Sequence, residues 1–180
     1  MVGGVKQLLL MIVVVALVGC GGKSGPVNIA DPILEKAIRM RIKKPTGELT
    51  EADLEEVTSL SFDDKKLTEV PKGLEKLPHL FGLTFYENQL ASVKGLKKLT
   101  QLEGLGLHRN KLTSVKGLGK LTELRELYLS YNQLTDVKAL EKLMQLEGLE
   151  LKYNPALTKT QIDELQKALP KCKIDSNPIK

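Results

Sequence analysis

A histidine, an arginine and an asparagine stand side by side at His108, Arg109 and Asn110, within the stretch LEGLGLHRNKL. Histidine changes its charge near neutral pH, so it is the side chain that most often serves as a general acid or base. The other histidine of the chain, His79, lies in a connecting segment just before Leu80 and is not expected to lie near His108. The cluster therefore favours a surface contact over a catalytic base.

The rest of the sequence adds no catalytic or metal-binding motif. It contains neither H-E-x-x-H nor G-x-S-x-G nor a phosphate-binding loop. The GLG at residues 104–106 lacks the strand-to-helix G-x-G-x-x-G context of a dinucleotide site, and four convergent metal ligands cannot be assembled. We predict a chain that is not an enzyme and carries no metal and no cofactor.

Composition sets a few further bounds. The chain has 180 residues, a formal net charge of +5 and only 4 % aromatic residues, with no Trp. Its core must therefore be mostly aliphatic, and the mild basicity does not indicate a nucleic-acid partner. Two cysteines, Cys20 and Cys172, cannot form a disulfide-rich scaffold.

One spacing of leucines occurs five times between Val57 and Leu157. The copies are VTSLSFDDKKL, LFGLTFYENQL, LEGLGLHRNKL, LRELYLSYNQL and LEGLELKYNPAL, 22 residues apart except for a first step of 23. The pattern L-x-x-L-x-L-x-x-N-x-L resembles bacterial leucine-rich repeats of the internalin-like kind. The resemblance implies a short α/β repeat solenoid of about five 22-residue repeats. Its parallel sheet would be concave, its convex side 3₁₀-like or extended, and helical caps would close both ends.

Stacking explains the pattern, because one repeat cannot bury its own leucines and each copy covers its neighbour. In the fourth repeat we expect these inward positions: Leu124, Leu127, Leu129, Leu134, Val137, Leu140 and Leu143. An asparagine recurs in one column at Asn88, Asn110, Asn132 and Asn154, and in the family this column forms a structural ladder of hydrogen bonds to backbone. The first repeat carries Lys65 there, as a terminal copy can.

The N-terminal cap is predicted at residues 31–56. Asp31 followed by Pro32 is a favourable helix start. The residues that follow form an apolar stripe of Ile33, Leu34, Ala37, Ile38 and Ile42. Thr50 and Asp53 have the spacing of a capping box, which predicts a second short helix.

The C-terminal cap and tail are predicted at residues 158–180, where the repeat pattern ends. Thr160 is the expected N-cap of a helix that Pro170 ends. Cys172 is expected to be a buried hydrophobe that shares a last strand with Ile174. The final DSNPIK is expected to be loose.

The residues between the strand leucines are expected to point into the concave face. Positions 2, 3, 5, 7 and 8 of each copy hold all four tyrosines, together with Ser130 and seven acidic against three basic side chains. Tyrosine is favoured in binding surfaces. The predicted ligand-binding residues are Tyr86, Glu87, His108, Arg109, Glu126, Tyr128, Tyr131, Glu150, Lys152 and Tyr153. A merely solvated surface is an equal alternative, and the lysine-rich convex side is the other candidate face.

The N-terminus carries an export pattern. Lys6 precedes the apolar run Leu8–Val18, which has the length of a signal-peptide core. The run ends in Leu17-Val18-Gly19-Cys20, which resembles the lipobox of bacterial lipoproteins. The resemblance implies a signal peptide at residues 1–19 and a lipidated Cys20, followed by a flexible tether at residues 20–30.

Together these patterns predict a membrane-anchored leucine-rich-repeat lipoprotein of the bacterial cell envelope. It would be a monomer that binds a protein or peptide through its concave face, touches the membrane through its lipid and binds no nucleic acid. Gly21 stands where Asp retains some lipoproteins in the inner membrane, which favours the outer membrane in a Gram-negative host. The alternative is a passive envelope scaffold or spacer without a specific ligand.

Overall fold

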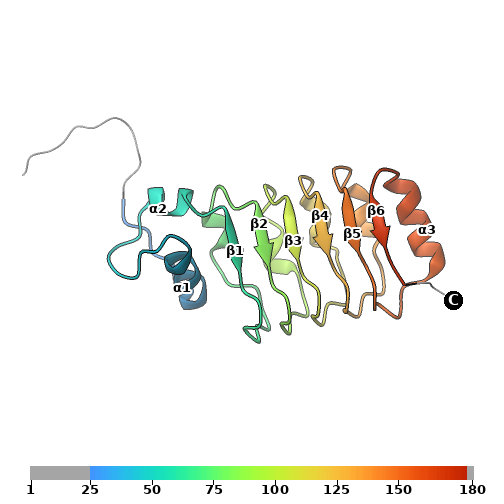
Figure 1. The fold of residues 1–180 in the computed structure, drawn as a ribbon, viewed down its shortest axis with the longest axis horizontal. Helices are drawn as coiled ribbons and strands as arrows, with labels where there is room; N and C mark the ends of the chain where they lie inside the picture. Colours follow the sequence, from blue (N-terminus) through green and yellow to red (C-terminus); the bar gives the residue numbers. More distant parts are fainter. Residues whose placement is uncertain (1–24, 178–180) are drawn as a thin grey trace, which may run out of the picture.

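A computed structural model describes residues 25–177, so the predicted signal peptide, Cys20 and the start of the tether lie outside the described residues. In this part of the chain one sheet contains six parallel strands in sequence order (Figure 1). They are β1 (Ser59–Ser61), β2 (Gly82–Thr84), β3 (Gly104–Gly106), β4 (Glu126–Tyr128), β5 (Gly148–Glu150) and β6 (Lys173–Asp175). Equivalent residues pair across neighbouring strands, as in Leu105 with Leu127. The predicted leucine-rich-repeat solenoid is therefore confirmed.

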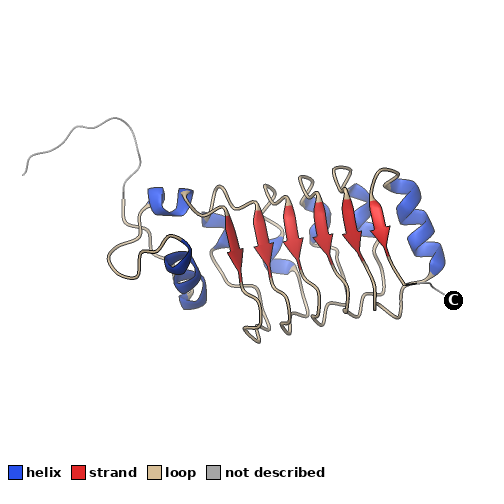
Figure 2. Cartoon of the chain, in the orientation of Figure 1, coloured by secondary structure: helices blue, strands red, loops and turns tan. Residues whose placement is uncertain are grey.

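Short 3₁₀ helices lie behind the sheet, one after each of the first four strands (Figure 2). They are η1 (Leu74–Lys76), η2 (Lys94–Leu96), η3 (Leu118–Lys120) and η4 (Lys138–Lys142). Successive turns approach closely: a Cβ at Gly119 would lie 2.7 Å from the carbonyl oxygen of Ala139. None of the described helices is long and apolar enough to cross a bilayer.

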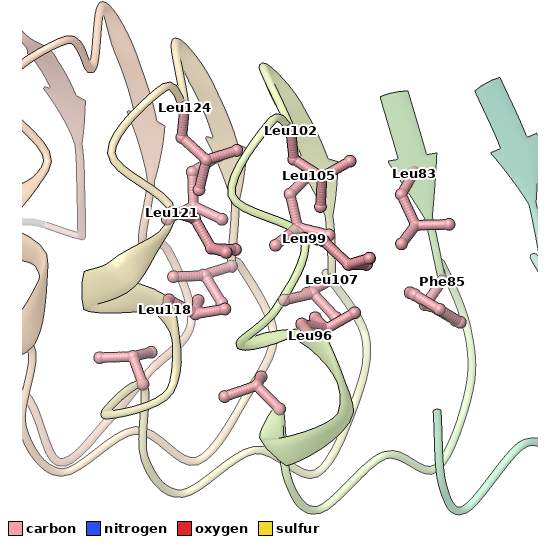
Figure 3. Packing of buried hydrophobic residues seen from close by; sticks show 14 of the residues in the cluster. Leu83, Phe85, Leu96, Leu99, Leu102, Leu105, Leu107, Leu118, Leu121 and Leu124 are labelled. Carbon is pink, nitrogen blue, oxygen red and sulfur yellow. The ribbon is translucent and has the colours of Figure 1, made fainter. Parts of the chain in front are cut away.

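Leucine side chains fill the space between the sheet and the 3₁₀ turns (Figure 3). Leu102, Leu105 and Leu107 of the third repeat are at most 1 % exposed. They pack in the same layer as Leu96 and Leu99, and the next repeat adds an equivalent layer. All seven inward positions expected for the fourth repeat are buried. The core is thus a row of similar layers, aliphatic except for Phe62 and Phe85, and each layer is covered by its neighbours.

The N-terminal end is closed by α1 (Pro32–Arg41) and α2 (Glu51–Glu55) (Figure 1). The Asp31 carboxylate caps α1 by accepting from two backbone N–H groups, at 3.0 and 3.2 Å. Leu34 and Ile38 are buried, but Ile33 is 43 % exposed, so its assignment to the buried stripe was wrong. Residues 33 and 34 are consecutive and project about 100° apart on a helix, which carries Ile33 off the packed face.

The predicted capping box of α2 is present at Thr50 and Asp53. The Asp53 carboxylate also accepts from Lys44 Nζ at 2.7 Å. These hydrogen bonds, first from Lys44 and then from Thr50, lower the pKa of Asp53 to about 2. The carboxylate therefore stays charged in the fold at any pH above about 4 and holds the loop before α2 against its helix.

The C-terminal end is closed by α3 (Lys159–Ala168) and β6. Thr158, rather than the expected Thr160, caps α3, because Gln161 completes a capping box with Thr158. Cys172 is buried, as expected, but lies just before β6. Asp175 belongs to β6 and pairs with Lys152 at 2.7 Å, so this part of the expected loose tail is ordered.

The two threonines give a matched test of the cap. Replacing Thr158 with alanine removes the acceptor of the Gln161 N–H and should lower the free energy of unfolding by about 1 kcal/mol. Thr160→Ala, in the exposed first turn, should change it by less than about 0.5 kcal/mol. Urea unfolding followed by circular dichroism measures both. Equal losses for the two variants would contradict the assignment of Thr158 as the cap.

Candidate binding surface

The concave face consists of the first and third residues of each strand, because the middle residue points into the core. Leu60, Leu83, Leu105, Leu127 and Leu149 are the buried middle residues of β1 to β5. The flanking residues, which are at least partly accessible except for Gly106, change character along the sheet. They are small in β1 to β3, whereas β4 and β5 carry Glu126, Tyr128 and Glu150.

The small residues leave a shallow hollow of about 460 Å³ over β1 to β3. Its floor includes Gly82, Gly104 and Gly106, while Arg41 of α1 and Tyr128 of β4 also line it. At Gly106 the backbone lies close to the neighbouring strand, and a Cβ there would meet the Thr84 side chain at a tight 3.2 Å. The hollow was missed in the sequence, although the run of Gly, Ser and Thr at the first three strands could have indicated it.

The acidic half of the concave face lies over β4 and β5. The Tyr128 hydroxyl donates to Glu126 Oε2 at 3.4 Å. Burial, followed by the charges of Glu126 and Glu150, raises the pKa of Tyr128, so its phenol stays protonated at neutral pH. Arg125 pairs with Glu147 at 2.6 Å. This half therefore offers a neutral ring flanked by carboxylates.

The turn that follows each of the first five strands has a residue in the left-handed conformation at the same position of the repeat, and the first turn has another at Lys66. The φ angles at the shared position lie between 52° and 58°, at Asp64, Glu87, Arg109, Tyr131 and Tyr153. This backbone is costly for residues other than glycine and persists only where the surroundings enforce it. Because it recurs in all five turns, it belongs to the repeat and does not mark one special site.

The asparagine column holds these turns. The Asn110 side-chain oxygen accepts from Leu90 N at 2.9 Å. Its Nδ2 donates to Phe85 O at 2.8 Å and to Leu107 O at 3.1 Å. Asn132 and Asn154 repeat this arrangement one and two turns later, whereas Asn88 donates to Phe62 O and accepts from Lys65 N and Leu67 N. Each amide therefore joins two repeats through buried backbone groups.

The side chains of the turns form an aromatic ridge, which we define as Tyr86, Glu87, His108, Arg109, Tyr131 and Tyr153. Arg109 Nη1 donates to Glu87 Oε1 at 3.1 Å. Its guanidinium lies 5.0 Å from the Tyr131 ring centroid, a cation–π distance. The Tyr131 and Tyr153 rings stack at 4.0 Å. Tyr131 and Tyr153 are 42 % and 51 % exposed, so the ridge presents a preformed aromatic surface to solvent.

His108 lies at the inner side of the ridge, with its ring centroid 4.0 Å from that of Tyr86. Its Nδ1 is buried and makes no protein hydrogen bond. Burial lowers the pKa of His108, and the nearby Glu150 opposes this only in part. The neighbouring Ser130, expected on the open surface, is 5 % exposed and therefore buried. Its Oγ is buried and, like His108 Nδ1, makes no hydrogen bond in the described part of the chain.

The lowered pKa gives a test of this packing. Since burial disfavours the charged imidazolium, folding loses stability as pH falls below about 6.5, where the unfolded chain takes up the proton first. Tyr86→Ala should uncover the imidazole and move the pKa of His108 up toward its ordinary value. Tyr153→Ala, which does not remove the ring stacked on His108, should leave it unchanged. Two-dimensional NMR titration of the imidazole signals measures the shift. Identical titrations in both variants would contradict burial by Tyr86.

The structure brings six of the ten predicted ligand-binding residues together in the aromatic ridge. Glu126, Tyr128 and Glu150 lie instead on the strands, and Lys152 is engaged by Asp175. Within residues 25–177 no group of three or more His, Cys, Asp or Glu residues has the geometry of a metal site. Burial raises the pKa of Cys172 to about 11, which makes its thiol unreactive.

Comparison with known proteins agrees with this geometry. The family model described as leucine-rich repeats (2 copies) matches residues 122–167. An internalin of Listeria monocytogenes superposes with a TM-score of 0.73 at 27 % identity, covering 87 % of this chain and 47 % of the internalin. This chain therefore has a leucine-rich-repeat fold. Leucine-rich-repeat folds of this kind are generally non-catalytic and typically bind proteins.

Two further solved structures have the same repeat fold. A leucine-rich-repeat protein of Leptospira interrogans gives a TM-score of 0.50 at 32 % identity over 61 % of this chain and 34 % of its own. The functional domain of an internalin J of L. monocytogenes, which includes a cysteine ladder, gives 0.60 at 23 % identity over 84 % and 37 %. The chain thus spans about half the length of the first internalin and just over a third of the length of each of the other two proteins. The search of curated proteins gave no match.

Proposed function

We propose that this leucine-rich-repeat protein is a lipid-anchored recognition module that binds a protein or peptide through the aromatic ridge and the adjoining concave face. The single observation that carries the proposal is the exposed, preformed stack of Tyr131 and Tyr153 next to Arg109. Aromatic and arginine side chains dominate the energetics of protein interfaces. Here the side chains of neighbouring repeats pack on one another, which already fixes the rotamers of Arg109, Tyr131 and Tyr153, so binding costs little side-chain entropy.

The lipobox at Leu17–Cys20 supports the anchor. A lipidated Cys20 would hold the protein at a membrane of the bacterial envelope, with the outer membrane favoured in a Gram-negative host. Mass spectrometry of the mature N-terminal peptide tests this part of the proposal. A thioether-linked lipid on Cys20 is expected, and an unmodified peptide that begins elsewhere would contradict it.

Affinity capture from envelope extracts tests the binding part. The variant Tyr131→Asn/Tyr153→Asn removes both rings and keeps a residue that tolerates the left-handed turn. The matched control, Lys97→Ala/Lys120→Ala, alters exposed lysines of the convex side. We expect a specific protein to be retained by the wild type and the control and lost at least about tenfold from the ridge variant, since hot-spot residues cost about 2 kcal/mol or more.

The same experiment separates the alternatives. Loss of capture with the lysine variant alone would assign binding to the convex side. Retention of no specific protein by any of the three would favour the passive scaffold or spacer, and equal retention of one protein by all three would contradict the proposed face. Circular dichroism must show the same melting transition in all three proteins, so that altered capture reports the surface and not the fold.

A further inference from the structure

An apolar and basic stripe remains exposed on the N-terminal cap, which contributes no residue to the aromatic ridge. Met40 of α1 is 71 % exposed and Ile33, on the same side of the helix, is 43 % exposed. Lys36 lies between them in sequence and, at these spacings, on the same face of the helix. Lys43 lies just past the end of α1, in the left-handed conformation, and lines the same hollow as Lys36 and Met40. Both lysines are exposed. We call Ile33, Lys36, Met40 and Lys43 the cap stripe.

The cap stripe borders two hollows of the surface. One, of about 890 Å³, lies between α1 and β1 and is lined by Ile33, Lys36, Met40 and Arg41 among others. The other, of about 450 Å³, lies on the opposite side of α1 and includes Lys36, Met40, Lys43 and Pro45. The apolar side chains therefore project between two recesses with no covering element in the described residues.

The charge around the cap stripe is positive. Glu35 is paired with Arg39 at 2.8 Å, and Asp53 is paired with Lys44 at 2.7 Å. Asp63, which also borders the larger hollow, accepts from Thr84 Oγ1 and from Tyr86 N. Lys36, Arg41 and Lys43 are in no ion pair within the described part of the chain. Exposed apolar groups between free cations suit an anionic lipid surface.

The length of chain before the cap sets its distance from any anchor. Pro26 is bridged to Thr50, and Val27 N donates to Leu49 O at 2.7 Å, so the chain is fixed to the cap from this point. Six residue steps separate Cys20 from Pro26. At most about 3.3–3.6 Å per residue, they span roughly 20 Å. A lipid on Cys20 would therefore keep the cap at the membrane surface.

We infer that the cap stripe docks on an anionic lipid bilayer and orients the solenoid. The inference rests on the proposed anchor at Cys20. Docking at this end lets the repeats extend away from the bilayer, because α1 and α3 lie at opposite ends of the solenoid (Figure 1). The aromatic ridge then remains open to a partner.

Photocrosslinking of the mature, full-length protein tests the docking. The photoreactive residue benzoylphenylalanine replaces Met40 in one protein and Met144 in a control. Met144 is 66 % exposed and lies between η4 and β5, far from the cap. Vesicles contain phosphatidylcholine alone or mixed with phosphatidylglycerol, and mass spectrometry counts lipid adducts. We expect several-fold more adducts at position 40 than at 144, and mainly on phosphatidylglycerol vesicles.

A second variant tests the charge. Lys36→Gln/Lys43→Gln should lower the adducts at position 40 at least about tenfold, because each lysine near an anionic surface contributes about fivefold. Equal adducts at positions 40 and 144, or adducts independent of lipid charge, would overturn the inference. Crosslinked dimers through position 40 in place of lipid adducts would also overturn it and assign the stripe to a second copy.

The N-terminal mass separates this inference from the anchor. If Cys20 is lipidated and position 40 gives no lipid adducts, the anchor stands and the docking is wrong. If Cys20 is unmodified and position 40 still gives adducts on anionic vesicles, the docking stands and the anchor is wrong.

Discussion

Replacing Asn132 with alanine is expected to lower the free energy of unfolding by about 3–5 kcal/mol. The Asn132 side-chain oxygen accepts from Leu112 N at 2.9 Å, and its Nδ2 donates to Leu107 O and Leu129 O, each at 3.0 Å. Alanine would leave one buried N–H without its partner and would remove a donor from two buried carbonyls. Each such group costs about 1–3 kcal/mol, so the losses combine into a large effect.

Gln133 supplies the matched control, because it is the next residue, is exposed and makes no side-chain hydrogen bond within residues 25–177. Gln133→Ala should change the free energy of unfolding by less than about 0.5 kcal/mol. Urea unfolding at neutral pH measures both variants. A loss below about 1 kcal/mol for Asn132→Ala would mean that water replaces the amide, and the column would not be the link between repeats.

The fold could be predicted because its cause is periodic. Each leucine of a repeat must pack against the equivalent leucine 22 residues later, in the next repeat. This constraint produces the regular leucine spacing that is visible in the sequence. The error at Thr160 has a local cause. Two threonines stand two residues apart, and only the glutamine at Gln161 decides between them, by completing a capping box with Thr158.

The candidate surface could be predicted only in part. Residues 22 apart, such as Tyr131 and Tyr153, must be neighbours in a stack with a rung about every 4.8 Å, so their pairing follows from the repeat. The small residues of the first three strands could have indicated the hollow, but the contribution of Arg41 does not follow from the repeat, because Arg41 reaches the hollow from the cap. The burial of Ser130 could not be predicted from the repeat pattern either, since position 7 holds larger residues in the other copies and the spacing alone assigns all of them to the open face.

The exposed cap stripe shows a second limit of prediction from the sequence. Periodicity assigns Ile33 to the apolar side of its helix, yet the cap has only one repeat to cover, and Leu34 and Ile38 suffice for that. The surplus apolar groups are visible only when the packing is known. Because closing the end of the core does not require these exposed groups, they indicate a second role for the cap.

The second large effect is expected at Phe85, which is fully buried and stacks on Phe62 with ring centroids 5.2 Å apart. The same column holds leucine in the next three repeats, at Leu107, Leu129 and Leu151. Phe85→Ala should therefore open a cavity between the first two repeats and lower the free energy of unfolding by about 3–5 kcal/mol. Phe85→Leu restores the common residue of the column and should cost less than about 1.5 kcal/mol.

The location of the stability loss in Phe85→Ala tests whether the repeats unfold together or separately. In a stack, stability is approximately the sum of repeat terms and nearest-neighbour interfaces. A weakened interface between the first two repeats should let the N-terminal cap and first repeat open before the rest, giving two transitions in urea, whereas Phe85→Leu keeps one. Hydrogen exchange at Leu60 and Leu127 would resolve the two parts. Equal acceleration at both residues in Phe85→Ala would show that the whole stack unfolds as one unit and that the Phe62–Phe85 contact is not its weak joint.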